Sequence, residues 1–139
     1  IDIIWFKRQS KDTKALKLVI MKLKKMRDYY FSEMKKEIAD IKINGSLEQR
    51  LPGNSNISFK NINGSELLLK LDEKGICASA GSACSSGNST PSHVLTAIGV
   101  DGEYAEGTLR VTFGDENTQE DLEYLIKNLK DIVRNLKNK

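Results

Sequence analysis

The sequence predicts one α/β domain in which a small mixed or antiparallel sheet is flanked by helices. Three observations support this: two long amphipathic helical patterns bracket the chain, short alternating apolar segments lie between them, and turn residues separate those segments. At 139 residues the chain is long enough for one domain with a buried core. The expected element order is α-β-β-α-β-α-β-α, without an internal repeat.

The first and the last helix have the clearest patterns. Over residues 11–37 and just beyond, apolar side chains recur at steps of three and four, which predicts one buried face: Leu16, Val19, Ile20, Leu23, Met26, Tyr30, Met34 and Ile38. A capping box of Thr118 and Asp121 is expected to begin the last helix. Its buried stripe is predicted to contain Leu122, Leu125, Ile126, Leu129, Ile132, Val133 and Leu136.

The first half of the remaining chain predicts short strands and one short helix. Residues 41–44 alternate up to Gly45, and residues 56–59 alternate again after a turn at 51–54, so both segments are predicted strands. Asn63 is expected to cap a helix with Glu66 at its third position, and Gly75 is expected to end it in a left-handed conformation. Residues 76–79 are a further strand candidate, with Cys77 in the core.

The second half predicts one more helix and one more strand. Thr90 is expected to cap a helix that has Pro91 at its first position and ends at Gly99. Its expected apolar face contains Val94, Leu95 and Ile98. Residues 108–113 alternate strictly, which turns Arg110 away from the core. The side chains expected on the core side of this strand are Leu109, Val111 and Phe113.

Composition excludes several classes of function. Hydrophobic residues make up 39% and charged residues 29%, which is ordinary for a globular protein. With 22 basic and 19 acidic residues the net charge is +3, too small to indicate nucleic-acid binding. No apolar run approaches about 20 residues and the start has no signal-peptide pattern, so no membrane association and a cytoplasmic location are expected. Two Cys and one His rule out a disulfide scaffold and disfavour a closed zinc site.

Cys84 is the candidate nucleophile. It lies in the segment 80–90, which is built almost entirely of Gly, Ser, Ala, Asn and Thr and is a predicted loop with no core to bury a thiol. The residues alone leave a catalytic thiol and an incidental exposed thiol both open. A protease-like pair with His93 is disfavoured because no Asn or Asp is placed to orient that histidine. A zinc site of Cys77, Cys84 and His93 would need at least one more ligand.

Four segments resemble a known family and follow one another in the same order as in that family. In chain order they are RLPGNSNISF at 50–59, ELLLKLD at 66–72, GICASAGSACSSG at 75–87 with PSHVLTAIG at 91–99, and GTLRVTFG at 107–114. The segment at 75–99 resembles the active-cysteine segment of cysteine desulfurases, which are pyridoxal-phosphate enzymes of the class-V aminotransferase type. The match is to the nitrogen-fixation-like (NifS-like) group with the long cysteine loop, and it extends from about Leu23 to Leu136.

The resemblance implies a fold, a reaction and two site residues. The fold would be that of the C-terminal domain of fold-type-I pyridoxal-phosphate enzymes. Cys84 would attack the sulfur of an L-cysteine substrate held on the cofactor, become a persulfide as alanine leaves, and pass the sulfur to an acceptor scaffold protein. Arg110 would bind the substrate carboxylate, which a planar guanidinium can hold with two parallel hydrogen bonds. Iron–sulfur cluster assembly or thio-modification would use that sulfur.

The departures from the family concern the cofactor. In the family, the lysine that binds pyridoxal phosphate directly follows a His, whereas here the only His, His93, is followed by Val94. The other cofactor-binding residues are missing as well, so no cofactor is expected to be bound to this chain. Residues 16–139 are therefore expected to be a C-terminal small domain whose large cofactor domain is absent, with residues 1–15 as a tail or N-terminal extension.

The isolated chain is accordingly expected to be inactive and, because it would expose apolar surface, to form a homodimer. Two alternatives remain. One is the corresponding domain of a selenocysteine lyase or a cysteine-sulfinate desulfinase. The other is a non-enzymatic sulfur carrier or partner-binding module.

Overall fold

The described residues form a three-stranded antiparallel sheet that packs against helices. The computed structural model describes residues 13–80 and 92–138. The strands lie in the order β1-β2-β3, and both neighbouring pairs are antiparallel, so the predicted α/β fold is confirmed. The elements are α2 (Thr13–Glu37), β1 (Ile41–Ile43), β2 (Asn54–Phe59), α3 (Gly64–Asp72), α4 (His93–Ala97), α5 (Gly102–Ala105), β3 (Thr108–Thr112) and α6 (Gln119–Lys137).

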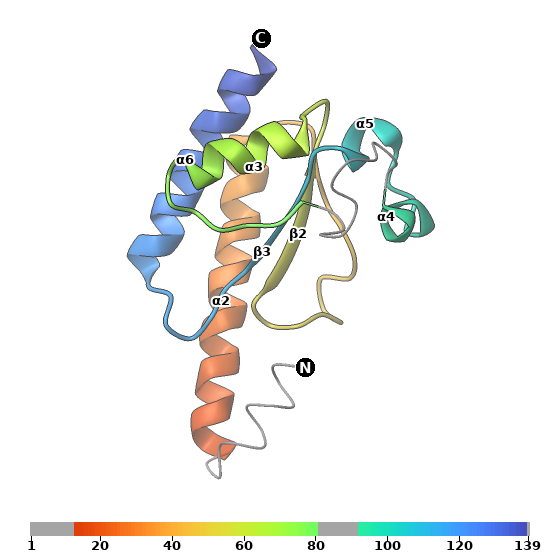
Figure 1. Ribbon diagram of the computed structural model, residues 1–139. Coiled ribbons are helices and arrows are strands. Elements are labelled where there is room, and N and C mark those ends of the chain that lie inside the picture. The colour runs from red at the N-terminus through yellow and green to blue at the C-terminus, as the bar shows by residue number, and fades with distance from the viewer. Residues whose placement is uncertain (1–12, 81–91, 139) are drawn as a thin grey trace.

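One continuous core joins α2, α3 and α6 to the sheet (Figure 1). The predicted stripes of the two long helices supply much of it, because the three- and four-residue spacing keeps their apolar side chains on one face. Tyr30 of α2 meets Phe113, which follows β3, edge to face at 5.7 Å between ring centroids. Leu109 and Val111 are buried while Arg110 between them is exposed, as the alternation predicted.

The predicted ends of α3 and the predicted start of α6 are confirmed. The Asn63 side chain accepts hydrogen bonds from the backbone N–H groups of Ser65 and Glu66, both at 3.0 Å. Thr118 and Asp121 form the expected reciprocal capping box at the start of α6. Gly75 adopts the left-handed conformation with φ of 70°, which a side chain would strain.

The predicted strand at residues 76–79 is wrong. The Ile76 N–H donates to the Leu71 carbonyl at the end of α3. Residue 76 therefore caps the C-terminus of that helix and does not pair with a neighbouring strand. Only Ser79 pairs with the sheet, through an isolated bridge to Arg110. The expected burial of Cys77 is also wrong, because Ile76 and Ala78 turn toward the core and leave the Cys77 thiol exposed.

The predicted helix after Pro91 is shorter than expected. It begins at His93, after Ser92 as the N-cap residue, whereas Thr90 and Pro91 lie outside the described residues. Five residues make little more than one helical turn, so of its expected apolar face only Leu95 is buried. Val94 and Ile98 remain exposed, while Gly99 ends the helix with φ of 72°.

The short helix α5 was not predicted from the sequence, because four residues carry no readable periodicity. Leu95 forms a small separate cluster with Val100 and Ala105, against which Tyr104 packs. In the part of the chain that the structure describes, no helix is long and apolar enough to cross a membrane.

Candidate functional site

Arg110 is the predicted site residue that the structure describes, and it lies on β3 between two polar neighbours. On one side, Ser79 pairs with it through two backbone hydrogen bonds, Arg110 N–H to the Ser79 carbonyl at 2.6 Å and Ser79 N–H to the Arg110 carbonyl at 3.0 Å. On the other side, Asn56 of β2 stands directly opposite in the register. Because both backbone groups of Arg110 face Ser79, the pair with Asn56 is the non-hydrogen-bonded kind, in which side chains stand closer.

A hydrogen-bonded network of polar side chains supports the sheet face that carries Arg110. Asn44 Nδ2 donates to Asn56 Oδ1 and to Ser58 Oγ, both at 2.7 Å. The Ser58 hydroxyl shares a 2.6 Å hydrogen bond with that of Thr108, which also donates to the Tyr104 carbonyl. Asn44, Ser58 and Thr108 are buried, so these contacts hold the neighbours of Arg110 in fixed orientations.

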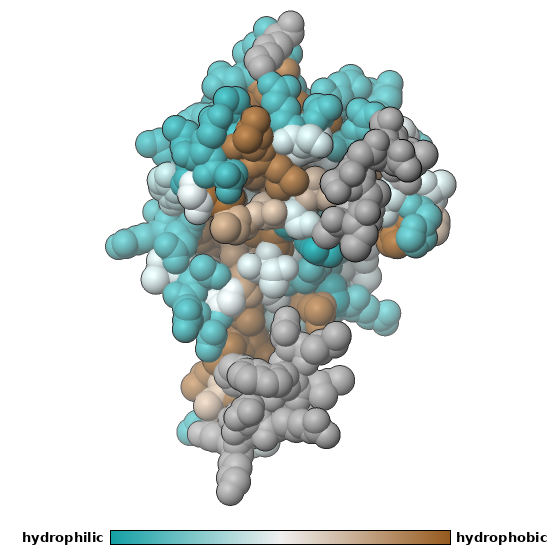
Figure 2. All heavy atoms as spheres, viewed as in Figure 1, coloured by the Kyte–Doolittle hydropathy of each residue, from teal (hydrophilic) through white to brown (hydrophobic). Residues whose placement is uncertain are grey.

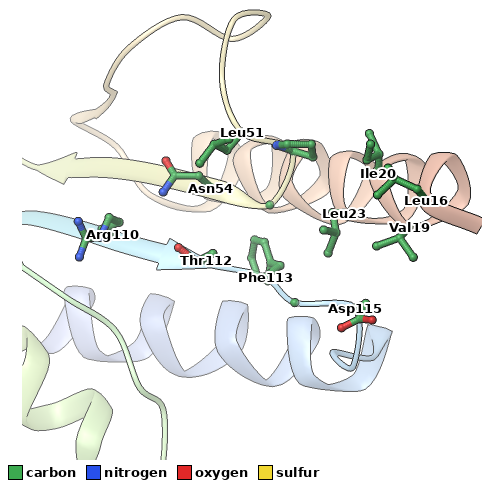
Figure 3. Close-up of a pocket in the computed structure, with 13 residues that line it drawn as sticks. Leu16, Val19, Ile20, Leu23, Leu51, Asn54, Arg110, Thr112, Phe113 and Asp115 are labelled. Atoms are coloured by element: carbon green, nitrogen blue, oxygen red, sulfur yellow. The ribbon is translucent and has the colours of Figure 1, made fainter. Parts of the chain in front are cut away.

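A groove with a cavity volume of about 520 Å³ extends from Arg110 to the first half of α2. Figure 3 shows Arg110 at one end of this groove, and Leu16 and Val19 at the other. The polar side chains in the lining are Asn54, Arg110, Thr112 and Asp115, and the apolar ones are Leu16, Val19, Ile20, Leu23, Leu51, Pro52 and Phe113. The groove is therefore mainly apolar, with one cationic group, Arg110, and one carboxylate, Asp115.

Apolar side chains also remain exposed along the first half of α2. Leu18 is 61% exposed and Met21 is 55% exposed, although Met26, Tyr30 and Met34 farther along the same helix are buried. In Figure 2 the apolar surface continues over α2 toward its N-terminal end. The amphipathic pattern of α2 extends beyond the edge of the sheet toward the N-terminal end of the helix. The first half of α2 therefore has less of the described chain to pack against.

The electrostatic setting of Arg110 suits an anionic ligand. Within residues 13–80 and 92–138, no carboxylate forms an ion pair with it, and its one side-chain hydrogen bond goes to the neutral Ser79 hydroxyl at 3.4 Å. A guanidinium has five N–H donors in a planar fork, so most of them remain available. This arrangement can hold a carboxylate through charge-assisted hydrogen bonds.

The groove does not fit pyridoxal phosphate. Among the described residues that line it, there is no lysine to bind the cofactor, and the one aromatic ring, Phe113, is buried in the core. Nor do the described residues contain a cluster of His, Cys, Asp and Glu that could hold a metal ion. What the described residues of the groove can do is bind and orient an anionic ligand through Arg110 and its neighbours.

The other candidate residues are not gathered at this groove. Cys84 lies outside the described residues, and in the sequence it follows Ser79 by five positions. Cys77 and His93 are both exposed and neither lines the groove. Sequence reasoning missed Ser79, whose position beside Arg110 depends on a contact across 31 residues. It also missed Asn56, which lies opposite Arg110. The alternation of β2 gives a signal for it: since Ile57 is buried on one face of the sheet, its neighbour Asn56 lies on the other face.

Comparison of the fold with solved structures gives the class of protein. A NifS-like protein superimposes with a TM-score of 0.73 and 30% identity, over 87% of this chain and 30% of its own. A NifS-like protein from Rickettsia africae gives a TM-score of 0.71 and 28% identity, over 86% of this chain and 30% of its own. The described fold is therefore that of one segment of a NifS-like enzyme.

The sequence family agrees with the fold. The sequence model of the Aminotransferase class-V family matches residues 13–125, and the chain belongs to that family. Cysteine desulfurase IscS of Dictyoglomus turgidum is 43% identical over 131 residues, covering 89% of this chain and 33% of that protein. Cysteine desulfurase IscS of Methanosarcina thermophila is 45% identical over 116 residues, covering 84% of this chain and 28% of that protein. The chain thus spans about a third of the length of the curated relatives it matches.

Proposed function

We propose that residues 16–139 act as the C-terminal small domain of a pyridoxal-phosphate-dependent cysteine desulfurase, with residues 1–15 as an extension. The observation that supports this most is the exposed guanidinium of Arg110. It has no carboxylate partner in the described chain, and it is bridged to the segment that leads into the Cys84 motif. The proposed substrate-binding cation is thus bridged to Ser79, which precedes the proposed nucleophile Cys84 by five positions in the sequence.

The proposed reaction converts L-cysteine and the Cys84 thiol into L-alanine and a Cys84 persulfide. The carbon–sulfur bond of L-cysteine breaks and a sulfur–sulfur bond forms at Cys84 Sγ. The β-carbon of the substrate gains a hydrogen in place of sulfur, so carbon is reduced while sulfur is oxidised, and all atoms balance. Arg110 holds the substrate carboxylate throughout, and the thiolate form of Cys84 is the nucleophile.

The cofactor is proposed to be held by another part of the polypeptide, because none of the described residues that line the groove is a lysine. The proposed partners are L-cysteine, a sulfur-acceptor protein and a second copy of the enzyme. The persulfide would supply iron–sulfur cluster assembly or thio-modification, and a cytoplasmic location remains a prediction.

The test compares the chain alone with a fusion in which residues 13–139 replace the aligned third of the Dictyoglomus turgidum relative. With pyridoxal phosphate and L-cysteine, the chain alone is expected to release no sulfide, and the fusion is expected to release sulfide and alanine. Mass spectrometry should find one added sulfur atom on Cys84, and Cys84→Ser should abolish turnover. Arg110→Lys should raise KM at least tenfold, because an ammonium cannot replace a bidentate guanidinium.

Three outcomes would contradict the proposal. Turnover by the chain alone would mean that it holds the cofactor itself. A folded but inactive fusion would favour a non-enzymatic sulfur carrier or partner-binding module. Faster turnover of selenocysteine or of cysteine sulfinate than of L-cysteine would assign the domain to a lyase or a desulfinase.

A further inference from the structure

We propose that Ser79 is a positioning residue for Arg110, and that its hydroxyl sets the direction in which the guanidinium meets a substrate carboxylate. This inference deepens the proposed function and rests on it. It concerns two residues that the structure describes, Ser79 and Arg110.

The backbone fixes where the two side chains stand. The reciprocal hydrogen bonds of 2.6 and 3.0 Å make Ser79 and Arg110 a hydrogen-bonded antiparallel pair. Side chains of such a pair project to the same side of the sheet. Leu109 and Val111 are buried on the other side, so Arg110 cannot turn over without exposing the core.

The side-chain contact then selects an orientation of the guanidinium. Arg110 Nη2 donates to Ser79 Oγ across 3.4 Å, a long hydrogen bond that restrains the exposed end of a flexible side chain. A hydroxyl is neutral, so it restrains the arginine without cancelling the charge that a carboxylate needs. The remaining N–H groups of the fork stay free for that ligand.

The other polar neighbour is engaged elsewhere. Asn56 Oδ1 accepts a hydrogen bond of 2.7 Å from the buried Asn44 side chain, and within the described residues the Arg110 guanidinium donates to Ser79 instead. Among the residues that the structure describes, Ser79 provides the hydrogen-bond acceptor for the Arg110 guanidinium. Removing this hydroxyl should therefore loosen the guanidinium while the backbone bridge remains.

The test uses a matched pair of variants in the fusion enzyme, Ser79→Thr and Ser79→Val. Both side chains are β-branched and have nearly the same shape, so any packing disturbance is shared and only the hydroxyl differs. Ser79→Val is expected to raise KM for L-cysteine about three- to tenfold with kcat within about twofold of wild type, because it weakens carboxylate binding. Ser79→Thr should restore KM, and Ser65→Ala, at an exposed serine on α3, should leave both constants unchanged.

A second readout uses the complete 139-residue chain and needs no turnover. The Arg110 side-chain signals in ¹H–¹⁵N NMR spectra should move in Ser79→Val and return toward wild-type positions in Ser79→Thr. An inactive wild-type fusion would reject the proposed function, while this NMR comparison would still test the contact. Equal KM values for the Val and Thr variants, in an active fusion where Arg110→Lys raises KM, would overturn the inference, and so would unmoved Arg110 signals.

Discussion

Replacing Tyr30 with Phe should stabilise the protein. Tyr30 lies in the core with 1% of its surface exposed, and its hydroxyl finds no hydrogen-bond partner among the described residues. An unsatisfied buried hydroxyl costs about 1–3 kcal/mol. The void left by one oxygen, roughly 10–15 Å³, costs only about 0.3 kcal/mol. The net expectation is a gain of about 1 kcal/mol in the free energy of unfolding, and a rise in Tm of about 3–5 °C.

Urea unfolding followed by far-UV circular dichroism would measure this gain, and Tyr124→Phe is the matched control. The Tyr124 side chain is half exposed, and its hydroxyl donates to the Lys74 carbonyl at 3.2 Å, so its removal should be neutral or slightly destabilising. If Tyr30→Phe instead lowers stability by 1 kcal/mol or more, the hydroxyl has a partner and the reasoning fails.

The same substitution should change the response to alkali. Burial raises the pKa of Tyr30 well above its ordinary value of about 10, since the ionised form would lose its hydration. Above about pH 10 the unfolded state therefore loses a proton that the folded state keeps, and stability falls by up to about 1.4 kcal/mol per pH unit. Tyr30→Phe should remove this part of the loss, and an unchanged alkaline slope would contradict the burial of the phenol.

Two further predictions concern stability. Gly107→Ala should lower the free energy of unfolding by about 3 kcal/mol or more, because a Cβ there would lie 2.2 Å from the Phe59 backbone oxygen. Gly102→Ala is the control, since a Cβ at that position would meet open space and should be tolerated. Thermal unfolding of the two variants compares them. Glu37 has a lowered pKa, mainly because Lys130 donates a hydrogen bond to it, so it stabilises the folded state above the ordinary carboxyl pKa and loses this effect as pH falls through the lowered value. Glu37→Gln should therefore be less stable than wild type at neutral pH and equal to it at strongly acid pH.

The parts of the fold that the sequence predicted depend on local chemistry. The stripe of α6 follows from its residue spacing, and the Asn63 and Thr118 caps follow from side chains that reach backbone groups within three residues. The outward direction of Arg110 follows from the period of two along β3. Each of these features needs only neighbours in the chain, so a single sequence contains enough information.

The sequence-based predictions were wrong where contacts between distant parts of the chain determine the structure. Cys77 resembled a core residue because it follows Ile76, yet the segment belongs to the end of α3 and pairs with β3 only at Ser79. Val94 of α4 and Ile98, its C-cap residue, have the spacing of a buried face, but the helix contains too few residues to bury it. Apolar spacing shows which residues share a face, and the tertiary structure decides whether that face is covered.

Three sets of contacts among the described residues restrain Arg110 and its neighbours. Leu109 and Val111 anchor β3 on one face, and the network that begins at Asn44 orients Asn56 on the other. The backbone bridge to Ser79 adds the third restraint on the position of Arg110. Within the described residues, this segment provides no lysine in the groove that could bind pyridoxal phosphate. Its proposed part in desulfuration is therefore to hold the substrate carboxylate and to connect that anchor, through Ser79, to the chain that carries the sulfur-accepting thiol.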